Sequence, residues 1–126
     1  MIEDELHANL ITVTGLSSLF ALMAGKSATV PYGVYNRIST QREQTLTGFV
    51  GNTEVAFQVD IYHSTRNAML VIKAALIARL KTYNQLTIGN TFIQSVEILN
   101  ETEDVEELNG SLKFKGIVEF SIYYAE

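Results

Sequence analysis

The alternation of apolar and polar residues from Thr53 to His63 constrains the fold more than any other feature of the sequence. An extended strand would place Val55, Phe57, Val59 and Ile61 on one face and Glu54, Gln58, Asp60 and Tyr62 on the other. Such a pattern is typical of a half-buried strand in an antiparallel sheet. A helix is predicted to follow, with Ser64 as its N-cap and helical residues from Thr65 to about Tyr83.

The remaining elements surround this strand and helix. The sequence predicts helices over residues 2–13 and 16–23, a strand over 32–39 after Pro31, a hairpin over 86–93 that extends to about residue 99, and a final strand over 111–124. Polar connections are expected over 41–52 and 100–110. We therefore predict a single α+β domain over residues 1–126. It would be a mainly antiparallel sheet packed against one long helix, with an N-terminal helical segment.

Composition narrows the classes of function. The chain has 126 residues, 47% of them hydrophobic and 18% charged, which favours a folded domain. Its net charge of -5 argues against sequence-specific contact with nucleic acid, and the lack of cysteine excludes disulfides and thiolate metal sites. The acidic start at residues 3–5 and the charges that interrupt the apolar stretch 68–80 predict a soluble intracellular product without a membrane span.

Two short motifs invite an enzymatic interpretation, and neither supports it. Gly25-Lys26-Ser27 ends like a phosphate-binding loop, but Phe20 stands where that loop needs its first glycine. Asp60, His63 and Ser64 lie close in sequence, but Asp60 and His63 would project from opposite faces of a strand. The sequence therefore predicts no catalytic residue, no cofactor, no metal site and no enzyme.

The long helix carries a second feature besides its sheet-facing stripe. Met69, Ile72, Leu76, Leu80 and Tyr83 form that stripe. A different side combines Leu70 and Ile77 with Arg66 and Lys73. Exposed apolar residues next to cations are typical of interface rims, so we predict a subunit interface there. The alternative is a partly covered helix with ordinary exposed leucines.

Charges are separated along the chain. Residues 64–96 contain cations and no acid, whereas the predicted loop over 101–107 contains Glu101, Glu103, Asp104, Glu106 and Glu107 and no cation. Both groups can simply face solvent. The acidic loop of one subunit can also meet the basic helix of a neighbour, or the acids can line a pore and repel DNA. The sequence leaves all three interpretations open.

Several stretches together resemble the tail-completion family of tailed bacteriophages. They are "VPYGVYNRIS" from Val30, "TLTGFVGNTEVAFQVDIYHST" from Thr45, the helix rich in alanine and leucine, and the closing "LNGSLKFKGIVEFSIYYAE". The resemblance implies a fold similar to the lambda-type tail terminator. It also implies a ring, usually hexameric, that caps the tail tube and offers a docking surface to the head connector.

The same resemblance implies a location and partners. The protein would act in the virion tail after assembly in the host bacterial cytoplasm, and DNA would pass through the ring without specific binding. In the connection over 41–52, Leu46, Phe49 and Val50 are candidates to contact a tube or neck protein, or to fold back onto the sheet. The alternatives are a neck adaptor between connector and tail, and a non-enzymatic α+β module that binds a small ligand.

Overall fold

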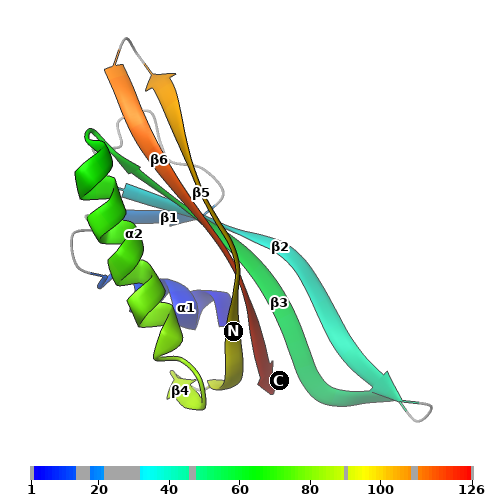
Figure 1. The fold of residues 1–126 in the computed structure, drawn as a ribbon. Coiled ribbons are helices and arrows are strands. Elements are labelled where there is room, and N and C mark those ends of the chain that lie inside the picture. Colours follow the sequence, from blue (N-terminus) through cyan, green and yellow to red (C-terminus); the bar gives the residue numbers. More distant parts are fainter. Residues whose placement is uncertain are drawn as a thin grey trace.

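The computed structural model describes residues 2–13, 18–21, 32–45, 48–89, 91–108 and 111–125, which form one sheet and two helices (Figure 1). The elements are α1 (Ile2–Leu10), β1 (Ser18–Ala21), β2 (Tyr32–Thr45), β3 (Gly48–His63), α2 (Arg66–Lys81), β4 (Leu86–Ile88), β5 (Thr91–Leu108) and β6 (Ser111–Ala125). The sheet has six strands in the order β1-β2-β3-β6-β5-β4.

The sheet is mainly antiparallel, as predicted. Among the described strands, β1 and β2 pair in parallel, and the other neighbours pair antiparallel. Two helices rather than one pack on it: α2 contacts β3, β5 and β6, and α1 contacts β4. Figure 1 shows α2 lying across one face, while the β2–β3 ribbon extends well beyond the helices.

The alternation in β3 produces the core as the sequence predicts. Val55, Phe57, Val59 and Ile61 are buried, and so are their neighbours Val118, Phe120 and Ile122 on β6. The rings of Phe57 and Phe120 stack with their centroids 5.7 Å apart. Burial of this apolar surface is the main force that holds the two central strands against α2.

Helix α2 presents the predicted stripe to the sheet. Met69, Ile72, Leu76 and Leu80 are buried on it, and Tyr83 is buried just beyond its end. The N-cap is Thr65 rather than Ser64. The Thr65 hydroxyl accepts a hydrogen bond from the Ala68 N–H, whereas the Ser64 N–H is used by the His63 ring at 2.8 Å.

Strand pairing defines two faces of the sheet, which we call the helix face and the far face. The pair Val59–Val118 lies on the helix face, and the adjacent pair Asp60–Ile117 lies on the far face. On β5, Glu103 is opposite Gly116, on the helix face. The paired residues Asp104–Lys115 and Glu106–Lys113 lie on the far face, because side chains alternate along a strand.

Three predicted segments are wrong. Residues 18–21 form strand β1 and not part of a helix over 16–23, because β2 supplies a pairing partner and helix propensity is weak over so few residues. The expected loop 41–52 is largely strand: β2 continues to Thr45 and β3 begins at Gly48. Backbone pairing between β2 and β3, rather than an alternating apolar pattern, extends these two strands into the expected loop.

The third correction concerns the acidic segment. Glu101, Glu103, Asp104, Glu106 and Glu107 lie on strand β5, not on a loop. Each is paired with a residue of β6. Cations of α2 and β6 lie beside several of these acids and offset the low strand propensity of a glutamate-rich segment.

A polar cluster joins α1 to the end of α2. The Asn9 side-chain oxygen accepts hydrogen bonds from the Tyr83 hydroxyl and from Arg79, and Arg79 also donates to the Asn9 carbonyl at 2.8 Å. Burial raises the pKa of Tyr83 to about 12, although the Arg79 charge acts in the opposite direction. The neutral hydroxyl is therefore the form that the folded protein favours.

This pKa predicts alkaline destabilisation. Because the folded pKa lies above the unfolded value of 10.0, the stabilisation is complete below pH 10 and is lost as the pH rises to about 12. The loss amounts to about 2–3 kcal/mol. Urea unfolding at several pH values measures this loss. The Tyr83→Phe variant should be less stable than the parent at pH 7 by about 1 kcal/mol, but its free energy of unfolding should not show this decrease between pH 10 and 12. Parallel curves for the two proteins between pH 10 and 12 would contradict the assignment.

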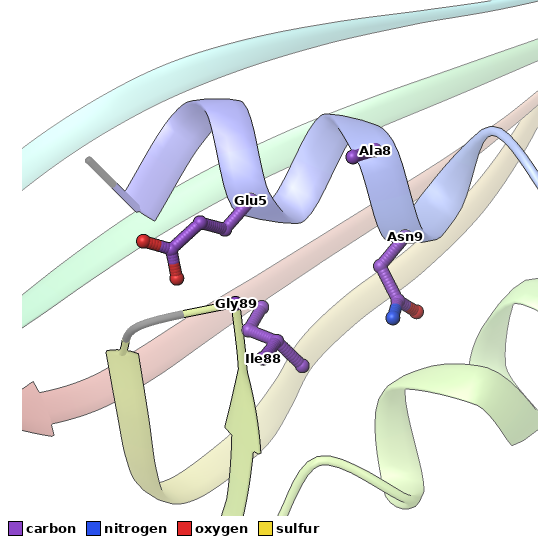
Figure 2. Close-up of a pocket in the computed structure, with 5 residues that line it drawn as sticks. All are labelled: Glu5, Ala8, Asn9, Ile88 and Gly89. Atoms are coloured by element: carbon purple, nitrogen blue, oxygen red, sulfur yellow. The ribbon is translucent and has the colours of Figure 1, made fainter.

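The turn between β4 and β5 depends on Gly89. Its φ is 57°, in the left-handed region, and Ile88 pairs directly with Thr91 as the predicted tight hairpin requires. Figure 2 shows this turn beneath α1, where Glu5, Ala8 and Asn9 line a pocket together with Ile88 and Gly89. A Cβ at Gly89 would lie 2.8 Å from the Glu5 Cγ.

Gly89→Ala is expected to lower the free energy of unfolding by about 1–2 kcal/mol, from backbone strain and the clash with Glu5. In a Glu5→Ala background the same substitution should cost only the strain, roughly 1 kcal/mol. Denaturant melts of the four proteins measure both parts. Equal costs in the two backgrounds would show that the close approach of Glu5 is unimportant.

Candidate subunit interface

A groove runs between the outer side of α2 and strand β5. Its lining comprises Leu70, Lys73, Ala74, Ile77, Ala78, Lys81 and Glu101, and its volume is about 390 Å³. Leu70 and Ile77 are partly buried and pack against the core. Three of the four residues that the sequence assigned to an interface, Leu70, Lys73 and Ile77, therefore line this groove, and Arg66 lies one turn before them.

Sequence reasoning missed the most exposed apolar residue of this helix. Val71 is 67% exposed, and Ala74 and Ala78 are exposed as well. Their spacing of three and four residues places them on one side of α2. The helical period that identifies the buried stripe also indicates this outward stripe, which consists of Val71, Ala74 and Ala78.

The separated charges meet within one subunit. The Arg66 Nη2 lies 3.0 Å from the Glu103 Oε2, and the Lys73 Nζ lies 3.9 Å from Glu101 and 3.8 Å from Glu103. The Arg66 side chain is 57% exposed, so this pair contributes at most about 1 kcal/mol to stability. The Arg66–Glu103 pair connects β5 to α2, the helix that lines the groove.

A second charge cluster lies on the far face. The Lys115 Nζ is 3.6 Å from the Asp60 carboxylate and 3.3 Å from the Glu106 carboxylate, and it lies over the Tyr62 ring. Burial alone would lower the pKa of Lys115, but Asp60, Tyr62 and Glu106 together raise it to about 12. The ammonium therefore remains charged and joins β3, β5 and β6 on this face.

Asp60 does not join His63 and Ser64, although the Ser64 Oγ lies 3.3 Å from the His63 Nδ1. The Gln58 amide donates to Asp60 on the far face, whereas the His63 Nδ1 accepts from the backbone N–H groups of Ser64 and Thr65. In the ranges that the structure describes, no group of three histidine, aspartate or glutamate residues could hold a metal ion. None of the helices described is long and apolar enough to cross a membrane.

Two of the three predicted partner-contact residues lie near the end of the described β2–β3 ribbon. Phe49 and Val50 belong to strand β3, where the backbone pair Gln44–Phe49 lies close to the turn. Leu46 and the Gly25-Lys26-Ser27 fragment lie outside the described residues. At the opposite end of the sheet, the β5–β6 hairpin exposes Val105 (49%) and Leu112 (58%).

Comparison with known proteins shows a similarity in fold but none in sequence family. No family model matches the chain, and no curated protein sequence matches it. Among solved structures, a chain from "Virion of native gene transfer agent (GTA) particle" is similar, with a TM-score of 0.65 and 14% sequence identity. The match covers 98% of this chain and 92% of that chain. The two chains therefore share one fold over nearly their whole lengths.

Proposed function

We propose that this protein is a non-enzymatic structural subunit of a phage or phage-like particle. The observation that carries the proposal is the near-complete overlap, in both directions, with a chain of the gene transfer agent virion. The proposal rests on likeness of fold, because the two chains are only 14% identical in sequence.

The finer proposal is a tail terminator that forms a closed ring, most simply a hexamer, on the end of the tail tube. Its mechanism is geometric: copies of the chain cover one another's grooves, one side of the ring stops tube growth, and the other accepts the head connector. The groove along Leu70, Lys73 and Ile77 supports such association, because it places apolar and cationic groups together at the surface.

The extended ends of the sheet are the proposed contacts with other virion proteins. The β2–β3 ribbon, which includes Phe49 and Val50 and leads to Leu46, would reach the tube or neck protein. The exposed Val105 and Leu112 would serve the same purpose at the opposite end. Long paired ribbons suit this role because the backbone hydrogen bonds between their two strands hold them together without a core.

The far face is the proposed path of DNA. From β3 to β5 its described residues include the acids Glu54, Asp60, Glu97, Asp104, Glu106 and Glu119, against the cations Lys113 and Lys115. An acidic excess repels phosphates, so DNA would pass without binding. Assembly in the host cytoplasm and a final place in the virion tail follow from the same proposal.

Electron microscopy of particles that lack this protein tests the proposal. A terminator predicts overlong tails that carry no head, and reintroduction of the gene should restore tails of normal length. Tails of normal length that fail to attach to heads would instead indicate a neck adaptor, which is the second candidate. Particles of normal appearance and infectivity would exclude both.

A further inference from the structure

Among the described residues, each edge of the sheet is paired over only a few positions. Strand β1 pairs only with Tyr32 to Tyr35 of β2, and β4 pairs only with Thr91 to Ile93 of β5. Among the described strands, none pairs with the outer side of β2 from Asn36 onward or of β5 from Ser95 onward. Each edge therefore presents a long row of backbone groups that can accept a further strand.

The β5 edge is shielded by its own side chains. The Glu101 N–H donates to the Asn100 side chain at 3.0 Å, and the Val105 N–H donates to the Asp104 side chain at 2.8 Å. The Val96 N–H donates to Asn84 at 2.8 Å. Glu101 and Val105 are four residues apart, so their N–H groups lie on the same edge. These bonds satisfy three N–H groups of β5 in a single subunit, and they can be exchanged for bonds to a neighbouring strand.

Strand direction and charge select the neighbour. The alternating order of the sheet makes β2 and β5 run in opposite directions, so copies arranged head to tail would join β5 to β2 in the antiparallel mode that the sheet already uses. Strand β5 has six acids and no base, whereas β2 has two arginines and one glutamate. A pair of β5 strands would place acids opposite acids, which is destabilising.

The groove on α2 lies on the same side of the molecule. Glu101 of β5 belongs to its lining, so a strand added at the β5 edge would also approach Leu70 and Ile77. From these observations we infer that the β5 edge of one subunit pairs with the β2 edge of the next copy and continues the sheet between subunits. Such a contact is heterologous, and it generates a ring when the rotation between copies closes. This inference deepens the proposed ring function and rests on it.

Cysteine cross-linking tests the inference, because the chain has no cysteine of its own. Ser39 on β2 and Ser95 on β5 are both exposed on the far face. Ser39 is opposite Ala56 of β3. Ser95 is opposite Tyr123 of β6, which is itself opposite Glu54 of β3. The two serines therefore lie at nearly the same position along the direction of the strands. Ser39→Cys and Ser95→Cys change one atom each and should leave the fold intact.

The double variant, treated with a short bismaleimide, is expected to give a ladder of multimers on a denaturing gel that ends at the ring size. Each single variant should remain monomeric. Strong dimers of the Ser95→Cys single variant would overturn the inference in favour of a two-fold β5–β5 contact. Rings visible by electron microscopy without a ladder would overturn it and leave the proposed function standing. Absence of any ring on tail tubes, with no ladder, would contradict the proposed function as well.

Discussion

Phe120→Ala is expected to lower the free energy of unfolding by about 3–5 kcal/mol. Phe120 has no exposed surface, and its ring stacks on Phe57 at the centre of the sheet, beneath α2. Removal of the ring leaves a cavity in the core between the sheet and α2, beside the Phe57 ring. Because total stabilities are typically roughly 5–15 kcal/mol, this loss is a large fraction of the stability of such a domain.

Urea denaturation followed by circular dichroism measures this effect. The matched control is Leu112→Ala, a substitution on the same strand at a residue that is 58% exposed. Its cost should be within about 0.5 kcal/mol of zero in the isolated subunit. Similar midpoints for the two variants would show that the core is not centred where the structure places it.

Val71→Glu is expected to raise the concentration needed for assembly by at least about 100-fold, while the subunit remains folded. The side chain is 67% exposed on α2, so a charge there is solvated in the isolated subunit. In the proposed assembly the neighbouring copy covers this side of the helix. An unpaired charge buried there costs several kcal/mol, and about 2.7 kcal/mol already corresponds to a factor of 100.

Thr87→Glu is the charge-matched control, because Thr87 is exposed on β4, away from the groove. Light scattering over a concentration series compares the two variants with the parent protein. Assembly of Val71→Glu at the parent concentration would exclude this side of α2 from the contact between copies. Equal weakening by both variants would indicate general charge repulsion.

Much of the fold follows from local pattern. The alternation of β3, the buried stripe of α2 and the hairpin at Gly89 could all be predicted, because each depends on a period or on one backbone conformation. Strand β1 could not be predicted, since its four residues are held by β2, a partner further along the chain. The acidic half of β5 reads as a loop from the sequence, because glutamate has low strand propensity and the cations Arg66 and Lys73 that lie beside it are distant in sequence.

The candidate interface was predictable only in part. Leu70, Lys73 and Ile77 were identified from helix geometry, and the structure places all three along one groove. The free edges of β2 and β5 had no signal in the sequence, because strand order in a sheet cannot be read from the strands themselves. We propose that the groove on α2 and the edges of β2 and β5 form the contact between copies.

The mass and symmetry of the assembled protein test most directly whether its copies associate into a ring. Purified protein would be studied by light scattering over a range of concentrations and, together with tail tubes, by electron microscopy. We expect a closed ring with rotational symmetry, either in solution or on the end of the tube. A subunit that remains monomeric at high concentration and leaves the tube ends bare would contradict it.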